Sequence, residues 1–468
     1  MTAQVCATIR MYRLLELGDC FLITFTVEDK TSHLLIDCGS FRNDGSSVGR
    51  LRAIVEDIAE VLGGKPLDVV VGTHQHNDHV SGFFHCESAF RAMSVDQVWL
   101  SWLDDPADER AQAIGKAHHN LLQSLTAARD ALPAARKAFD ETPGATRALE
   151  VLDDMLGSFG ATAAGAAPQI PAEGMEILRT LGTKDPLYLS PGRTLEMPGL
   201  GGRVRVHVLG PPRRDDLLRR RNPRRGESYD HALASAELQA AKLSDAAIRA
   251  DEEQHYPFNG IYKRLNASDS RRPSEPKAGL PTVIDHYENP GDEWRKIDDA
   301  WMESAGALAL YLHELTNNSS LVLAIELVES GKVLLFAADA QTGNWLSWNE
   351  VKWDLEGVST DELLARTVFY KVGHHGSHNA TLPAAFAKMT HRQLVAFIPV
   401  HKDDPNIARQ NGGWKMPAKA LLEKLQERTK NRVLRMDDED SPDRNAAWQR
   451  IDVAPEITPL AIKLEIWG

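Results

Sequence analysis

The sequence predicts an α/β protein in which sheet layers are sandwiched between helices. Two observations support this fold class. The chain has two β-rich halves that each also contain helices, and an apolar strand in each half leads into a group of histidines, at 73–82 and at 367–380. We therefore treat residues 1–468 as a single domain that carries a helical insertion at 105–165 and an irregular arginine-rich insertion at 213–300.

The first half opens with strands. Three apolar runs between residues 10 and 40, separated by turn-forming and polar residues, predict three strands. The runs LDVVV at 67–71 and DQVWLSW at 96–102 predict two more. A helix between them is predicted by apolar residues at helical spacing and by the two glycines that end it: Leu51, Ile54, Val55, Ile58, Leu62, Gly63 and Gly64. A second helix begins near Ser81, so the predicted order is β-β-β-α-β-α-β.

The two insertions differ in composition. Residues 105–160 are rich in Ala, Leu and charged residues and are interrupted at Pro133 and Pro143, so they predict two or three helices. Residues 202–212 return to a strand pattern, whereas residues 213–300 are polar and irregular. A structureless segment of that length in a compact domain is usually functional or disordered.

The second half returns to strands and ends with a helix and two apolar runs. The segment 317–340 predicts a β-hairpin, and 367–380 predicts a strand that ends in the second histidine group. A further strand is predicted at 393–400 and a helix at 417–429. The tail adds RVLRM and AIKLEIW, and no internal repeat is evident.

Composition narrows the classes of protein. Apolar residues make up 43% and charged residues 25% of the chain, as is ordinary for a globular protein. The net charge of −13 argues against a general nucleic-acid coat or a membrane-surface protein. The four cysteines show no paired spacing, and neither a signal peptide nor a spanning apolar run is evident. We therefore predict a cytoplasmic protein that does not enter a membrane.

The stretch THQHNDHVSG places three histidines and an aspartate within six positions, directly after a buried strand. Alternate side chains of an extended segment point the same way, so His74 and His76 are predicted to hold one metal ion. Asp78 and His79 lie where the chain turns into a helix and would hold a second ion. The alternative is a surface turn with incidental histidines.

The second half supplies the remaining predicted ligands. Asp339 ends the apolar strand VLLFAA, where an unpaired buried carboxylate would be costly. A bridging position between two ions about 3.5–4 Å apart removes that cost. The alternative for Asp339 is a helix N-cap. His374, His375 and His378 follow the next strand, and only one of the adjacent pair is expected to bind metal.

These motifs resemble the metallo-β-lactamase superfamily, and within it the hydrolase domain at the C-terminus of the competence protein ComEC. The superfamily likeness rests on THQHNDHVSG and on Asp37 in LLIDCGS, which is similar to the family's D-x-G strand end. The likeness to the ComEC domain rests on LGDCFLI, NNSSLVL, Asp339, KVGHHGS and NGGWKMPAKALLEKL followed by RVLRMDD. The resemblance implies a four-layer αβ/βα sandwich with two divalent ions, Zn or Mn, at the sheet edge.

The resemblance also implies roles for individual residues. His375 would be a ligand of the second ion, while Asp78, His374 and His378 would lie at the reaction centre, with His374 facing the substrate. Asp37 would orient a metal-bound histidine. The family's usual histidine after the central strand is missing from LGPPRR, so the first ion would be held by His74, His76, Asp339 and water, an incomplete site.

The resemblance favours a phosphodiesterase or nuclease that attacks its substrate with a metal-bridging hydroxide. The arginine cluster at 213–225, Arg42 and Lys371 are candidate phosphate partners, although the cluster also fits a solvated loop on an acidic protein. One alternative is a carboxylic ester, lactone or thioester hydrolase. Another is a weakly active or inactive metal-binding regulatory module whose helical insertion binds a partner protein. The sequence does not indicate an oligomeric state.

Other conspicuous residues are predicted to be structural. His207 is interpreted as a strand-face residue, and Cys38 as a small buried side chain with no base beside it. Trp345 and Trp348 are predicted to pack on the core. His118, in the helical insertion, is predicted to be exposed.

Overall fold

The computed structural model describes residues 4–136, 151–160, 170–220, 300–409, 413–439, 447–448, 451 and 455–468. One sheet consists of β1 (Cys6–Tyr12), β2 (Cys20–Val27), β3 (Lys30–Cys38), β4 (Leu67–Val71), β5 (Val95–Ser101), β6 (Leu187–Leu189), β14 (Glu456–Ile457) and β15 (Ala461–Trp467), in the order β14-β15-β1-β2-β3-β4-β5-β6. The other consists of β7 (Thr194–Glu196), β8 (Val204–Gly210), β9 (Val322–Leu327), β10 (Lys332–Phe336), β11 (Thr367–Lys371), β12 (Val395–Ile398) and β13 (Val433–Arg435), in the order β13-β12-β11-β10-β9-β8-β7.

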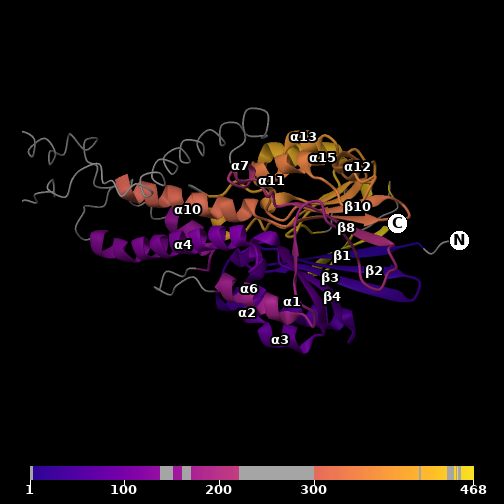
Figure 1. Cartoon of the computed structure of the whole chain (residues 1–468), viewed down its shortest axis with the longest axis horizontal. Helices are drawn as coiled ribbons and strands as arrows, with labels where there is room; N and C mark the ends of the chain where they lie inside the picture. Colours follow the sequence, from indigo (N-terminus) through magenta and orange to yellow (C-terminus); the bar gives the residue numbers. More distant parts are fainter. Residues whose placement is uncertain are drawn as a thin grey trace, which may run out of the picture.

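Helices cover the outer face of each sheet (Figure 1). The larger sheet is covered by α1 (Gly45–Leu62), α2 (Asn77–His85), α3 (Glu87–Ala92) and α6 (Ile170–Leu181). The smaller sheet is covered by α11 (Thr342–Ser347), α12 (Thr360–Ala365), α13 (Pro383–Phe386) and α15 (Lys419–Thr429). The predicted fold class, an αβ/βα sandwich, is confirmed.

Local sequence explains the first helix. Asp44 accepts hydrogen bonds from the backbone N–H groups of Ser46 and Ser47, which caps the N-terminus of α1. The predicted apolar stripe is buried, and Gly63 ends the helix with a left-handed backbone (φ 56°) that glycine adopts without strain. The predicted order of the opening elements is correct, except that the second helix is broken at Cys86 into α2 and α3.

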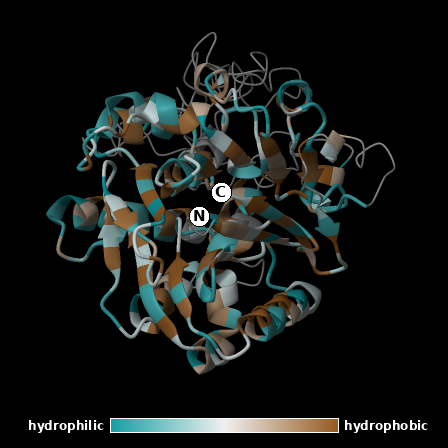
Figure 2. Ribbon diagram, turned by 90° about the vertical axis from the view of Figure 1, so that its right-hand side faces the viewer, coloured by the Kyte–Doolittle hydropathy of each residue, from teal (hydrophilic) through white to brown (hydrophobic). Residues whose placement is uncertain are grey.

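The main core lies between the two sheets. Phe21 of β2 meets Phe336 of β10 edge to face, with ring centroids 5.6 Å apart. Ile23, Leu34 and Val206 belong to the same buried cluster. Figure 2 shows hydrophobic residues recurring along the strands in the middle of the molecule, with hydrophilic residues on the outer helices. This packing fixes the ends of strands from both halves against one another.

The parallel strands determine where the histidines meet. β3, β4 and β5 run parallel in one sheet, and β10, β11, β12 and β13 run parallel in the other. Carboxyl ends of parallel strands lie at the same edge of a sheet, which is where sites form in folds of this kind. Both histidine segments follow such ends, β4 and β11.

The described parts of the insertions form helices beside the sandwich. α4 (Glu109–Arg136) lies along α10 (Ala300–Asn318), as Figure 1 shows. Residues 151–157 are also helical. A separate apolar cluster joins these three segments: Leu125, Leu152, Met155, Leu156, Phe159, Ala309 and Leu312. Of the predicted irregular insertion, residues 213–220 include the short helix α7 (Asp215–Leu218), and residues 221–299 lie outside the described residues.

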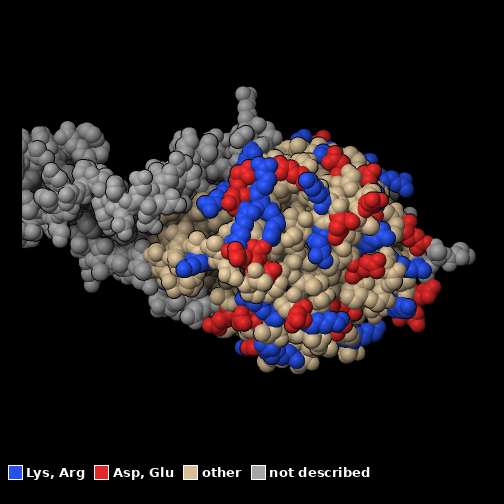
Figure 3. Space-filling model, in the orientation of Figure 1, with Lys and Arg blue, Asp and Glu red and all other residues tan. Residues whose placement is uncertain are grey.

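In the described part of the chain, no helix combines the length and apolar character needed to cross a membrane. Figure 3 shows acidic and basic side chains interspersed over one face of the molecule.

Candidate metal centre

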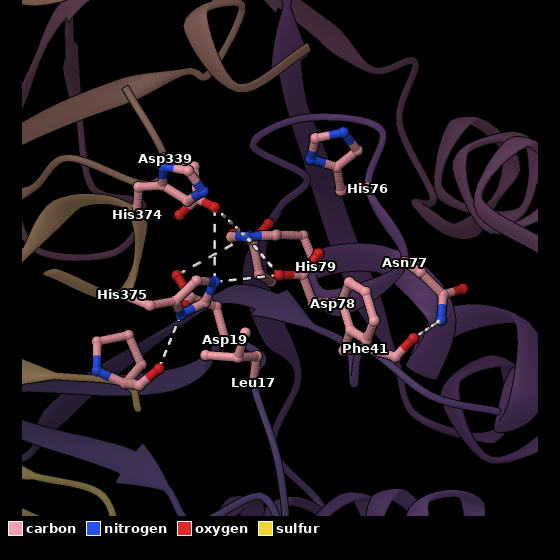
Figure 4. Close-up of polar contacts among 12 residues, drawn as sticks. Leu17, Asp19, Phe41, His76, Asn77, Asp78, His79, Asp339, His374 and His375 are labelled. Carbon is pink, nitrogen blue, oxygen red and sulfur yellow. Dashed lines mark hydrogen bonds and ion pairs between the residues drawn. The ribbon is translucent and has the colours of Figure 1, made fainter. Parts of the chain in front are cut away.

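Four strand ends bring the predicted site residues together. Asp37 is the next-to-last residue of β3, and residues 73–79 follow β4. Asp339 follows β10, and His375 follows β11. Figure 4 shows Asp78, His79, Asp339 and His375 pointing toward one another, with His76 to one side. Side chains that are far apart in the sequence thus share one buried pocket.

Gly39, the glycine of the D-x-G motif, allows the end of β3 to lie close to the backbone of Asp78 and His79. A Cβ atom at Gly39 would lie 2.4 Å from the backbone nitrogen of His79 and 2.5 Å from the carbonyl carbon of Asp78, so only glycine fits. The helix that follows begins at Asn77, earlier than the predicted start near Ser81. Asp78 and His79 therefore project from the first turn of α2, which packs tightly on the end of β3.

The tightest group contains the ligands predicted for the second ion. One potential ligand atom from each of Asp78, His79, Asp339 and His375 lies within 4.8 Å of the other three. His375 Nε2 is 3.0 Å from Asp78 Oδ2 and 3.5 Å from Asp339 Oδ2, and His79 Nε2 is 3.3 Å from Asp339 Oδ2. His374 is not in this group, in accord with the expectation that only one of the adjacent histidines is a ligand.

Burial and charge act in opposite directions on these groups. Burial lowers the pKa of the His79 imidazole, but Asp339, Asp78 and Asp37 together raise it well above its usual value. Burial likewise opposes protonation of His375, whose pKa is nevertheless raised by Asp339 and Asp78. Burial raises the pKa of the Asp339 carboxyl, but the cations around it, first His79, hold it well below its usual range. The carboxylates are therefore ionised and the site attracts cations.

The donor set fits a divalent metal ion. Asp78 Oδ1 and His79 Nε2 are buried and have no hydrogen-bond partner, although orphaned buried polar atoms are costly. The second nitrogen of His79, Nδ1, contacts Asp37 Oδ2 at 2.8 Å, and Nδ1 of His375 contacts the carbonyl oxygen of Pro399 at 2.7 Å. Metal-binding histidines are commonly held by such contacts at the nitrogen that faces away from the metal. Asp37 thus occupies the orienting position predicted for it.

His74 and His76 form a second pair of donors. His74 Nε2 and His76 Nδ1 are 3.1 Å apart, close to the separation of about 3.3 Å expected for two nitrogens on one tetrahedral zinc ion. His74 Nδ1 is steadied by the hydroxyls of Thr73 and Ser320. Among the described residues, no third His, Cys, Asp or Glu joins both imidazoles in a tight group. His207 does not fill this gap, because it lies within β8 between Thr194 and Glu326.

Two further charged residues complete the floor of the site. Asp19, at the start of β2, forms a second possible ligand group with Asp37 and His79. Lys371 forms an ion pair with Asp19 and lies 3.4 Å from Asp339 Oδ1. Sequence reasoning missed Asp19, although the segment LGDCFLI drew attention to its neighbourhood. Lys371 was predicted as a phosphate partner, but the structure buries it beneath the carboxylates.

The backbone is strained at several of these positions. Asp37 (φ 56°), Ala338 (φ 45°), His374 (φ 42°) and His375 (φ 51°) all adopt left-handed conformations. For residues other than glycine such conformations cost about 1–3 kcal/mol each, and they cluster at functional sites. Their presence on three different strand ends indicates that the surrounding packing holds the side chains of the centre in place.

A cavity of about 210 Å³ opens beside this centre. Its wall combines Met155, helix α10 and residues 413–416, so the insertions help to enclose it. The polar and charged side chains that line it are His313, Glu314, Gln341, His374, Ser377, His378, Asn379 and Lys415. His374 and His378, both predicted to lie at the reaction centre, thus line this cavity. His313 escaped sequence reasoning, since a single histidine in a helical segment gives little signal.

Several peripheral predictions need correction. Arg42 pairs with Glu16, and the guanidinium of Arg213 pairs with Asp108 above the ring of Trp102. Arg214 likewise pairs with two carboxylates, so these arginines do not support a phosphate site. Arg219 and Arg220 follow α7 at the end of the described segment, and the cluster members at 221, 224 and 225 lie outside the described residues.

The histidine of the helical insertion is also not where the sequence predicted it. His118 is not exposed: its Nε2 contacts the hydroxyl of Thr316 on α10 at 2.8 Å. The predicted core roles of Trp345 and Trp348 are confirmed by their complete burial, and Cys38 is a buried free thiol.

Comparison with known protein families bears on this site. Residues 15–95 match the metallo-beta-lactamase superfamily. The match spans β2 to β4 and includes Asp19, Asp37 and the whole HxHxDH motif. Members of this superfamily are mostly metal-dependent hydrolases that bind divalent metals. A comparison with curated proteins found no match. The narrower likeness to the ComEC domain has no support from either comparison and stays a prediction.

Proposed function

We propose that the protein is a metal-dependent phosphodiesterase or nuclease. The observation that carries the proposal is the convergence of Asp78, His79, Asp339 and His375 within 4.8 Å, in a fold whose motif segment matches a superfamily of metal-dependent hydrolases. Two imidazoles and two carboxylates suit zinc or manganese. His74 and His76 would hold the first predicted ion, with water completing its coordination.

The chain itself positions the reactants. Divalent ions in such a site lower the pKa of bound water toward about 7 and stabilise negative charge on the attacked group. Asp37 and the carbonyl of Pro399 fix the rings of His79 and His375. Lys371 balances the carboxylates from below. His374, on the cavity side, is available to contact the substrate.

The cavity favours a phosphate ester over an uncharged substrate. Its lining includes the imidazoles of His374 and His378, the hydroxyl of Ser377, the amide of Asn379 and the ammonium group of Lys415, which outnumber the single carboxylate, Glu314. Phosphoryl groups carry several acceptor oxygens and negative charge, so a lining with many donors suits them. The modest volume suits a nucleotide-sized ester or a strand end better than an intact duplex.

Hydrolysis of bis(p-nitrophenyl) phosphate with added Mn²⁺ or Zn²⁺ tests the proposal. Asp339→Asn keeps the size of the side chain and removes its charge. Loss of a residue that supports a metal ligand typically costs about 10- to 100-fold in activity, and loss of the ligand itself should cost no less. The rate of hydrolysis should therefore fall at least about 100-fold. The matched control is Asp361→Asn, which removes an exposed carboxylate paired with Lys388. Equal activity in Asp339→Asn and the control would refute the proposal.

The same assay separates the alternatives. Hydrolysis of p-nitrophenyl carboxylic esters, lactones or thioesters without hydrolysis of phosphodiesters would indicate the carbon-ester class. The incomplete surroundings of His74 and His76 are the observation that favours a regulatory module. Fewer than one metal ion per chain after purification with metal, together with no hydrolysis of either substrate class, would indicate that module.

A further inference from the structure

One amide joins two imidazoles that come from separate parts of the chain. Asn317 and His313 lie one turn apart on α10, and His374 follows β11. The amide nitrogen of Asn317 lies 3.1 Å from His313 Nε2 and 3.2 Å from His374 Nε2. All three side chains are buried, and both rings line the cavity beside the metal centre.

This contact determines which ring nitrogens carry protons. The amide of Asn317 has two N–H groups and donates one to each ring. A ring nitrogen that accepts a hydrogen bond has no proton of its own, so each neutral imidazole carries its proton on Nδ1. His313 and His374 therefore both present Nδ1–H as a donor.

Neither donor has a partner in the fold. His313 Nδ1 and His374 Nδ1 are buried and make no hydrogen bond to the rest of the described chain. Buried donors without acceptors are costly, and a ligand that supplies acceptors removes the cost. The rings are 5.8 Å apart between centroids, so one small group with several oxygens is able to reach both.

The surroundings place this pair beside the reaction centre. The His313 ring lies 4.7 Å from that of His76, and His374 precedes the ligand His375 in the chain. Among the described residues, no tight group of potential metal ligands includes His313 or His374. Donation to a substrate therefore fits these two rings better than coordination of an ion.

We infer that His313 and His374, joined by Asn317, form a paired donor site for the non-bridging oxygens of a phosphoryl group bound at the metal centre. The inference rests on the proposed function and extends it, because it names the residues that recognise the anion. Helix α10, which follows the long insertion, thereby contributes a substrate contact from outside the motif segments. Asn317 acts as a positioning residue that fixes both tautomers.

Inorganic phosphate is a suitable probe, with calorimetry on the full chain loaded with Zn²⁺. His313→Phe keeps a flat ring and removes one donor, so the dissociation constant for phosphate should rise about 10- to 100-fold. The metal content should be unchanged. The control is His118→Phe, which alters a half-buried histidine that contacts α10 at Thr316 and does not line this cavity. It should bind phosphate as the wild-type protein does.

A second variant tests the tautomers directly. Asn317→Asp replaces the donor amide with a carboxylate, which accepts a hydrogen bond from an Nε2–H group of each ring, so each neutral ring carries its proton on Nε2 and not on Nδ1. Nitrogen NMR of the metal-loaded protein should show His313 and His374 changing from the Nδ1–H to the Nε2–H form, and phosphate binding should weaken. This readout does not depend on turnover and would not change if Asn317 only stabilised the fold.

Three results would overturn the inference: phosphate binding that is equal in His313→Phe and wild type, loss of a metal ion in His313→Phe, or Nε2–H tautomers in the wild-type protein. A protein that binds phosphate through His313 but hydrolyses no phosphodiester would keep the paired site and refute the proposed function. A protein that hydrolyses phosphodiesters but binds phosphate independently of His313 would support the proposed function and refute the paired site.

Discussion

Lys371→Met tests whether the charges beneath the metal centre are balanced within the fold. The Lys371 side chain is 1% exposed, forms an ion pair with Asp19 and contacts the carbonyl oxygen of Ala338 at 2.8 Å. Methionine has a similar length and no charge. Removing one member of a buried ion pair costs about 3–5 kcal/mol, because the remaining charge is left uncompensated. We expect the free energy of unfolding of the metal-free protein to fall by that amount.

The assay is urea unfolding followed by tryptophan fluorescence, with Lys388→Met as the control. Lys388 pairs with Asp361 at the surface, so its loss should cost at most about 1 kcal/mol. In the double variant Lys371→Met/Asp19→Asn, both charges are gone and part of the loss should be recovered. A change below about 1 kcal/mol in Lys371→Met would refute the view that Asp19 and Asp339 depend on this cation.

Three further predictions concern the backbone and the ions. Gly39→Ala places a methyl group against the first turn of α2, so it should lower the free energy of unfolding by about 1–3 kcal/mol and reduce the amount of bound metal. The control is Gly49→Ala, whose added methyl group meets no atom within 4 Å, and it should change neither quantity. Ala338→Gly relieves a left-handed backbone (φ 45°) and should raise the free energy of unfolding by about 0.5–1 kcal/mol, with a decrease as the contrary result. Raised pKa values at His79 and His375 stabilise the metal-free protein below about pH 6.5, and this contribution is lost as the pH rises through the folded-state pKa. Zn²⁺ replaces those protons, so its affinity, measured by competition with a chelator, should increase with pH beyond 6.5, and a flat profile would contradict this.

Short-range patterns explain why much of the site was predictable. His74, His76, Asp78 and His79 lie within one segment, and the apolar run before them identifies a strand end. Asp339 stands out because a carboxylate directly after a buried strand needs a partner. The carboxyl ends of parallel strands lie at one edge of a sheet, so residues that follow such strands are expected to lie close together.

Other parts of the site depend on packing that the sequence does not encode locally. Asp19 becomes part of the centre only because β2 lies against β3, and Lys371 turns inward to meet it. His313 and Asn317 reach the cavity because α10 packs on α4 and the helix at 151–157. His118 was predicted to be exposed because it lies in the helical insertion, yet it is half-buried and contacts Thr316 of α10.

The division of the ligand set between the two halves of the chain bears on how the protein matures. Asp78 and His79 are synthesised well before Asp339 and His375, which lie in the second half of this sequence. A nascent polypeptide that stops short of Asp339 would hold half of the donors and retain an ion poorly. Firm metal binding therefore requires the second half to be synthesised and packed against the first, which makes a firmly held ion a signature of correct assembly of the two halves.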